Sequence, residues 1–184
     1  MPEPARAPVL AVRNLVKTFG PVRAVDGISL DILPAEVLGI IGDNGAGKST
    51  FLSLLTGYNR PDSGTLLHHG KPVRISSPAV ARRLLGIEMI YQKLELAPDL
   101  TVAENLFLGE EPRRFGVFAS HRAMQSRAAA VLAALNTKIR PNDIVAELSG
   151  GEQQVVAIAR AVLFERSIVI MDEPTAAISV QKVA

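Results

Sequence analysis

The segment GDNGAGKST, residues 42–50, contains the residues whose types and spacing are best suited to chemistry. Gly42, Gly47, Lys48 and Ser49 fit the pattern G-x-x-x-x-G-K-[ST]. Glycine lets backbone N–H groups turn inward around a phosphate chain, because no Cβ stands in the way. Lys48 can reach the β and γ phosphates as a positive charge, and Ser49 offers a hydroxyl to Mg²⁺. The segment therefore predicts a phosphate-binding loop.

The elements on either side of this loop agree with that interpretation. Residues 37–41 are an apolar run that predicts a strand buried on both faces, and residues 48–56 predict a helix ended by Gly57. The positive end of such a helix adds to the attraction for phosphate. A flexible glycine-rich loop would match the pattern by chance in roughly 1% of chains this long, because glycine makes up about 7% of residues. The other residues assigned to the phosphate site are Asp43, Asn44, Gly45, the small Ala46 and Thr50.

A second candidate site is the acidic pair in IVIMDEP, where an apolar strand is followed by Asp172 and Glu173. Open α/β sheets bind ligands at the carboxyl ends of their strands. Asp172 is suited to hold Mg²⁺, directly or through water, and Glu173 can polarise the water that attacks the γ phosphate. Alone, such a pair is more often a solvated turn. Together with the phosphate loop, the pair favours the catalytic interpretation.

Apolar periodicity predicts the elements that must position these groups. Further strands are predicted at residues 9–15, 28–32, 65–69, 87–91 and, as a buried strand, 168–171. Helices are predicted after Ser77 and Pro78, over 120–135 with Ser120 as a cap, and from Ser149, with Val155, Ile158, Ala159 and Val162 on one stripe. Thr101 and Glu104 predict a capping box within a mostly helical stretch, 93–147. Alternating strands and helices indicate an α/β domain with a largely parallel sheet.

Composition limits the classes of function. The chain has 184 residues, 48% hydrophobic and 21% charged, as in a soluble globular domain. A net charge of +2 is too small to favour nucleic acid as a partner. The sequence contains no cysteine, which excludes disulfides and thiolate metal sites. It also contains no secretory signal and no apolar run long enough to span a membrane, so we expect any membrane association to come through a partner.

The segment LSGGEQ, residues 148–153, completes a set of motifs that resembles the ABC ATPase family over about residues 9–178. Alone, Ser149 is a helix cap, and Gly150 and Gly151 expose backbone N–H groups at a helix start. The resemblance implies that this surface, Glu152 included, closes on the γ phosphate held by another subunit. The working unit would then be a head-to-tail dimer with two ATP molecules between its halves.

The resemblance also implies a fold and further site residues. It implies a P-loop NTPase with a mostly parallel core sheet, N-terminal antiparallel strands and a helical subdomain, divided as residues 1–92, 93–147 and 148–184. Phe19, in KTFG, resembles the aromatic residue that stacks on adenine, although a lone Phe is otherwise more often core. Gln92, in IYQ, resembles the glutamine that senses Mg²⁺, and is otherwise a polar strand end. With Lys48 and Glu173, it completes the predicted catalytic set.

Three stretches resemble the sugar-importer branch of the family: GDNGAGKST, IEMIYQKLELAPDLTVAENLFLG and MDEPTAAIS. They are similar to ATPases that serve ribose, xylose or fructose permeases. This resemblance implies an ATPase on the cytoplasmic face of the inner membrane, bound to a permease and served indirectly by a periplasmic or extracellular sugar-binding protein. The alternatives are a non-catalytic nucleotide-binding fragment and an ABC ATPase of DNA repair or translation. The insertions or second cassette of those repair and translation proteins are not present in this sequence.

The chain ends at Ala184, before the strand and switch histidine that the resemblance implies. His68, His69 and His121 lie in turn-like or helix-start positions, where we expect solvated side chains. That strand normally lies between the phosphate-loop strand and the strand that ends at Asp172. We therefore expect a truncated fragment with unpaired backbone groups, marginal stability and weak turnover.

Overall fold

The computed structural model describes residues 6–91, 94–114 and 118–172. The predicted site residues Gln92 and Glu173 lie outside these ranges. The chain divides into two compact units, Met1–Glu88 and Met89–Ala184, which are described one at a time.

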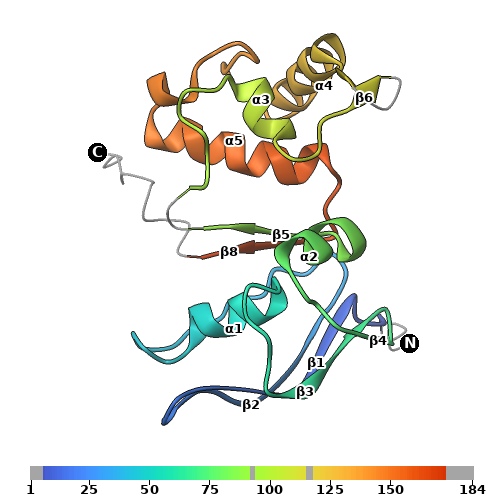
Figure 1. The fold of residues 1–184 in the computed structure, drawn as a ribbon, viewed down its shortest axis with the longest axis vertical. Helices are drawn as coiled ribbons and strands as arrows, with labels where there is room; N and C mark the ends of the chain where they lie inside the picture. Colours follow the sequence, from blue (N-terminus) through green and yellow to red (C-terminus); the bar gives the residue numbers. More distant parts are fainter. Residues whose placement is uncertain (1–5, 92–93, 115–117, 173–184) are drawn as a thin grey trace, which may run out of the picture. The chain divides into compact units, whose positions relative to one another are not determined.

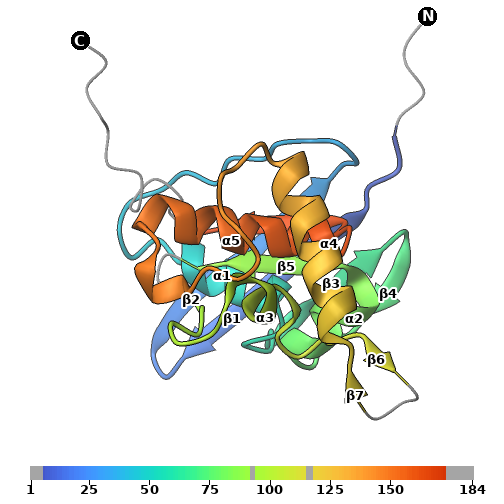
Figure 2. The same cartoon turned by 90° about the horizontal axis from the view of Figure 1, so that it is seen from above.

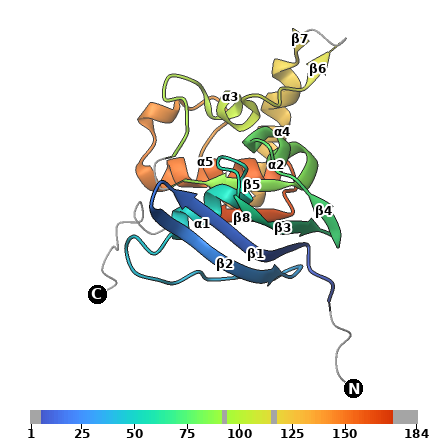
Figure 3. The same cartoon turned by 60° about the horizontal axis from the view of Figure 1, so that its bottom comes forward.

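The first unit contains an antiparallel sheet with the strand order β2-β1-β3-β4 (Figures 1 and 3). Its strands are β1 (Leu10–Phe19), β2 (Val22–Ile32), β3 (Ser63–His68) and β4 (Lys71–Val73). Leu10 pairs with Ile32 on one side and with His68 on the other. The central strand therefore supplies much of the core, and Leu10, Val12 and Leu15 are fully buried. The predicted N-terminal antiparallel strands are confirmed.

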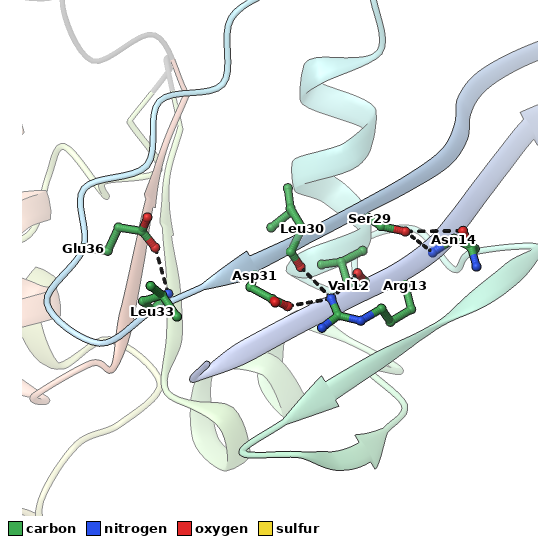
Figure 4. A network of polar contacts seen from close by, with 8 residues as sticks. All are labelled: Val12, Arg13, Asn14, Ser29, Leu30, Asp31, Leu33 and Glu36. Atoms are coloured by element: carbon green, nitrogen blue, oxygen red, sulfur yellow. Dashed lines mark hydrogen bonds and ion pairs between the residues drawn. The ribbon is translucent and has the colours of Figure 1, made fainter. Parts of the chain in front are cut away.

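Polar side chains reinforce the pairing of β1 with β2 (Figure 4). Arg13 forms an ion pair with Asp31 and donates to the carbonyl oxygen of Leu30 at 3.2 Å. The register shifts between Val12 and Leu15, and there the backbone N–H of Asn14 donates to Ser29 Oγ at 2.8 Å. A side chain thus replaces a backbone acceptor at the bulge. Beyond β2, a side-chain oxygen of Glu36 accepts from the backbone N–H of Leu33 (Figure 4).

Two helices follow the predicted positions in this unit. Helix α1 (Lys48–Leu55) buries Phe51, Leu54 and Leu55. Helix α2 (Pro78–Leu85) starts with proline at its first position, and Ser77 Oγ accepts from the N–H of Val80. The sequence signals at the helix starts therefore predicted both helices of this unit correctly.

The predicted strand at residues 37–41 is not formed. No strand within the described ranges pairs with this segment, and the exposed fractions of Val37 and Ile41 are 100% and 96%. An extended segment becomes a strand only when its N–H and C=O groups find partners on a neighbouring strand. Apolar character predicted burial here, but burial also depends on that partner, and this prediction was wrong.

Three helices form the body of the second unit (Figures 1 and 2). They are α3 (Val102–Phe107), α4 (His121–Ala134) and α5 (Gly150–Leu163), with the short 3-10 helix η1 (Val145–Glu147) before α5. Their shared core includes Val102, Leu106, Phe107, Leu132 and Val156. The capping box of Thr101 and Glu104 begins α3 as predicted. Within the described residues, no helix is both long enough and apolar enough to cross a membrane.

The remaining strands of the chain are short. Strands β6 (Arg113–Arg114) and β7 (Phe118–Ala119) form an antiparallel pair. Strands β5 (Ile87–Ile90) and β8 (Ile168–Met171) pair with each other. In the described part of the chain, this pair is all that forms of the predicted core sheet. Strand β8 was predicted to be buried, but Val169 and Met171 each keep 41% exposure, because successive side chains of a strand point to opposite faces.

The buried face of α5 differs from the predicted stripe. Of the four predicted residues only Ala159 is buried, and Val162 keeps 46% exposure. The residues that α5 buries are Gln154, Val156, Ala159 and Ala161. Val156 and Ala159 belong to the core that α5 shares with α3 and α4. The positions of these two helices, which periodicity does not reveal, select the buried face of α5.

One of the three histidines also departs from the prediction. His68 lies in β3 and is half-buried, and its Nε2 is buried without a hydrogen-bond partner. Burial lowers the pKa of His68, and the charge of His69 lowers it further. His69 and His121 are exposed, as expected.

We predict that Phe107→Ala destabilises the helical core strongly. The Phe107 side chain is fully buried and packs edge-to-face on Phe164, with ring centroids 5.8 Å apart. Removing the ring leaves a cavity, and the free energy of unfolding is expected to fall by about 3–5 kcal/mol. Urea denaturation followed by circular dichroism measures this loss. The control Leu108→Ala, at a site with 41% exposure, should lose far less, and equal losses would contradict the packing described.

Candidate functional site

The glycine-rich loop before α1 has the backbone geometry that its sequence predicts. Gly45 and Gly47 have positive φ angles of 84° and 89°. The N–H of Ala46 donates to the carbonyl oxygen of Asp43 at 3.1 Å, and closes a turn at Asn44 and Gly45. Residues 42–46 are exposed. A Cβ at Gly42 would lie 3.3 Å from the Cβ of Ala46, so the loop is narrow. Its backbone is therefore accessible to a ligand.

Gly47 fixes this loop to the sheet. A Cβ added to Gly47 would overlap the carbonyl oxygen of Ala24 in β2. Its φ of 89° also lies in the left-handed region, where any other residue is strained. Only glycine therefore allows the end of the loop to approach β2 this closely. The contact places the start of α1 against the strand.

The first turn of α1 is suited to an anion. Gly47 is the N-cap and provides no side-chain hydrogen bond, and the first turn carries no acidic residue. The N–H of Phe51 donates to the carbonyl oxygen of Gly47 at 2.8 Å, which is the first hydrogen bond of the helix. The N–H groups of Lys48, Ser49 and Thr50 therefore have no acceptor within the helix. Together with the helix dipole, they form a positive surface at the end of the loop.

Lys48 folds back over the loop from the start of α1. Its ammonium donates to the carbonyl oxygens of Gly42 at 2.7 Å and Asp43 at 2.9 Å. Charge-assisted bonds to phosphate oxygens are stronger than bonds to neutral carbonyls, so a bound phosphate chain can replace these two. Ser49 is exposed in the same turn, and Thr50 is half-buried beside it. The predicted phosphate-site residues therefore lie together in one loop and helix start.

Phe19 ends β1 in the same unit. Its side chain is 46% exposed, which argues against the alternative that it belongs to the core. The ammonium of Lys17 lies 5.4 Å from the centroid of the Phe19 ring. An exposed aromatic ring at a strand end can stack on a flat base.

The LSGGEQ segment begins α5 with a capping box. Ser149 Oγ accepts from the N–H of Glu152 at 3.4 Å, while the Glu152 carboxylate accepts from Ser149 N–H at 2.9 Å and Ser149 Oγ at 2.7 Å. These hydrogen bonds lower the pKa of Glu152. Gly150 and Gly151 are exposed. The sequence predicted the Ser149 cap but not the reciprocal hydrogen bond to Glu152, although S-x-x-E is the usual signal for such a bond.

The remaining predicted groups are only partly described. Asp172 follows β8 in the second unit and is half-buried, and its N–H donates to the carbonyl oxygen of Ile90 at 3.1 Å. Gln92 and Glu173 lie outside the described residues, so their roles stay predictions. The predicted residues fall into two sets. The phosphate loop and Phe19 belong to the first unit, and the start of the LSGGEQ helix and Asp172 belong to the second.

We predict that Gly47→Ala damages both stability and the binding of phosphate ligands. The added methyl group overlaps the carbonyl of Ala24, so β2 and α1 must move apart. Gly27→Ala is the matched control, because Gly27 also has positive φ, at 66°, but its Cβ meets nothing within 4 Å. Thermal melting should show a loss of roughly 1–2 kcal/mol for the control, from backbone strain alone. A loss in Gly47→Ala no larger than that would contradict the close approach.

Comparison with known proteins agrees with the fold and the loop. The ABC transporter family model matches residues 25–176. A ribose import ATP-binding protein of Rubrobacter xylanophilus is 47% identical over 176 residues, which cover 96% of this chain and 35% of that protein. The fructose import ATP-binding protein of Rhizobium meliloti is 44% identical, covering 97% of this chain and 71% of that protein.

A solved structure leads to the same family. An ATP-binding cassette of an ABC transporter superposes with a TM-score of 0.80 at 31% identity, and the match covers 94% of this chain and 71% of that one. The chain spans about a third of the length of the ribose import ATP-binding protein. The residues that the family model matches include the phosphate loop, the LSGGEQ segment and Asp172. The chain therefore belongs to the ABC transporter family.

Proposed function

We propose that this chain binds and hydrolyses ATP and so powers the import of a monosaccharide through a membrane permease. The observation that carries the proposal is identity of 44–47% to ribose and fructose import ATP-binding proteins over nearly the whole chain. The exposed phosphate loop supports it, because its geometry suits a triphosphate.

The loop residues divide the binding of the phosphates among them. The N–H groups at the start of α1 donate to phosphate oxygens, and Lys48 places its charge beside the β and γ phosphates. The loop residues 42–47 surround the chain of phosphates with backbone rather than side chains. Phe19 stacks on the adenine ring. Residues 42–50 and Phe19 thus account for both ends of the nucleotide.

The donor groups of this chain fit Mg²⁺, a hard cation that prefers oxygen ligands. Ser49 offers an exposed hydroxyl in the first turn of α1, and Asp172 offers a carboxylate at the end of β8. We assign Gln92 to the same ion. When bound, the ion would neutralise part of the negative charge of the phosphates.

Hydrolysis requires a water aligned with the γ phosphate. We assign Glu173 the task of polarising that water and accepting its proton. Lys48 stabilises the charge that develops on the γ phosphate oxygens as the bond to the β phosphate breaks. Gln92 connects the site to the helical segment.

A second copy of the chain completes each site. The start of α5 presents the N–H groups of Gly150 and Gly151 beside the capping box of Ser149 and Glu152. Helix starts of this kind attract anions. We infer that this surface contacts the γ phosphate bound by the other subunit, in a head-to-tail dimer that holds two ATP molecules.

The partners follow from the same proposal. Residues 93–147 contact the membrane permease, and a sugar-binding protein outside the cell acts indirectly through that permease. The chain lies on the cytoplasmic face of the inner membrane. It has no nucleic acid partner.

We predict that Lys48→Ala lowers the affinity for Mg-ATP by roughly tenfold to a hundredfold, because a charge-assisted bond to phosphate is lost. Calorimetric titration measures the change, with Lys71→Ala on β4 as the control lysine. Cells that carry Lys48→Ala in place of the wild-type chain should lose uptake of one labelled pentose or fructose, and keep uptake of amino acids.

The same titration distinguishes the proposal from its alternative. Glu173→Gln should bind Mg-ATP with near wild-type affinity and release no phosphate. Unchanged affinity in Lys48→Ala would contradict the assignment of the loop. Wild-type chain that binds ATP without releasing phosphate would favour a non-catalytic nucleotide-binding fragment.

A further inference from the structure

An acidic residue outside every motif holds the end of β1. Asp62 lies immediately before β3, and its carboxylate accepts three hydrogen bonds from the end of β1. The donors are Lys17 Nζ at 2.8 Å, the backbone N–H of Thr18 at 2.7 Å and Thr18 Oγ at 2.6 Å. Lys17 and Thr18 are the two residues before Phe19, and both bind one carboxylate that is more than 40 residues away in the sequence.

The sheet explains why a side chain is needed at this point. The pairing of β1 with β3 ends at Val16 and Ser63, while the pairing with β2 continues to Phe19 and Val22. Beyond Val16, the edge of β1 that faced β3 therefore has no strand beside it among the residues that the structure describes. The backbone N–H of Asp62 donates to the carbonyl oxygen of Val16 at 2.9 Å, and its carboxylate accepts from the next N–H on that edge. Asp62 thus extends the ladder by one residue.

The same carboxylate holds the cation beside Phe19. Lys17 Nζ lies 2.8 Å from an Asp62 oxygen and 5.4 Å from the centroid of the Phe19 ring. The Lys17 side chain keeps only 17% exposure, so its position is restricted. The hydrogen bonds from Lys17 and Thr18 lower the pKa of Asp62 to about 2, so the carboxylate stays charged at neutral pH.

We propose that Asp62 is a positioning residue for adenine, which acts through Thr18 and Lys17 to hold the Phe19 ring in place for the base. The inference rests on the proposed binding of adenine at Phe19. Most exposed ion pairs contribute little, because the two side chains must give up freedom to meet. Asp62 differs from them in that a backbone N–H and a hydroxyl share its carboxylate with the lysine. The residue therefore restrains the strand end as well as a charge.

The test compares two ligands of which only one carries adenosine. Calorimetry measures the affinity of the full chain for Mg-ATP and for magnesium tripolyphosphate, which has neither adenine nor ribose. We expect Asp62→Ala and Phe19→Ala each to weaken Mg-ATP by about fivefold or more, the size of one stacked base. Neither should change the affinity for tripolyphosphate. The double variant with both Asp62→Ala and Phe19→Ala should bind Mg-ATP no more weakly than Phe19→Ala alone, because both substitutions remove the same interaction.

Two further variants keep this comparison strict. Asp62→Asn keeps an oxygen acceptor for Thr18 but removes the charge that holds Lys17, and it should show a smaller loss for Mg-ATP. It also replaces Asp62→Ala if that variant folds poorly. The control is Asp31→Asn, which removes a carboxylate of similar exposure, 45% against 40%, paired with Arg13 on the same sheet. It should leave both affinities unchanged.

Each contrary outcome has a separate meaning. If Phe19→Ala weakens Mg-ATP but both Asp62 variants bind it normally, the positioning role is wrong and the adenine site stands. Equal weakening of both ligands by the Asp62 variants would also overturn the positioning role, because it indicates general damage to the fold. Normal Mg-ATP affinity in Phe19→Ala would overturn the adenine site and the inference with it.

Discussion

The proposed nucleotide site depends on the close approach of Gly47 to the carbonyl of Ala24. A residue with a side chain could not occupy that position, because its Cβ would overlap the carbonyl oxygen. The contact fixes the end of the phosphate loop on β2, while Phe51, Leu54 and Leu55 bury the apolar side of α1. Strand, loop and helix thus hold one another in place. The N–H groups at the start of α1 are consequently organised before any ligand arrives.

The two helix starts in the proposed site treat their backbone N–H groups differently. In α1, the N-cap residue Gly47 has no side chain to accept a hydrogen bond, so the first-turn N–H groups remain for the phosphates. In α5, the Ser149 hydroxyl already accepts from the N–H of Glu152. The capping box leaves Gly150 and Gly151 exposed but fixes the helix start. This difference suits the proposed roles, in which α1 holds the nucleotide throughout and α5 contacts it only when two subunits close.

Local signals in the sequence predicted local structure well. The phosphate-loop pattern, the capping box at Thr101 and Ser77 before Pro78 each identified a helix start that the structure contains. These features depend on residues within a few positions of one another, so one sequence is enough to find them. The family resemblance, based on LSGGEQ and the acidic pair, added the ABC ATPase fold, which the comparisons support.

Features that depend on distant neighbours were predicted poorly. Residues 37–41 have the composition of a buried strand, yet strand formation needs a partner that the pattern does not reveal. The buried face of α5 depends on where α3 and α4 pack, so the predicted stripe placed Val162 on the wrong face. The contacts of Asp62 with β1 were not predicted for the same reason, because its partners Lys17 and Thr18 are distant in the sequence.

The most direct test of the account is hydrogen–deuterium exchange of the full chain with and without Mg-ATP. In the proposed site the phosphates lie on backbone N–H groups, whose exchange this measurement follows directly. We expect saturating Mg-ATP to slow exchange in residues 42–50 and to leave α4, residues 121–134, unchanged. Unaltered exchange in residues 42–50, or protection confined to other segments, would contradict the proposed site.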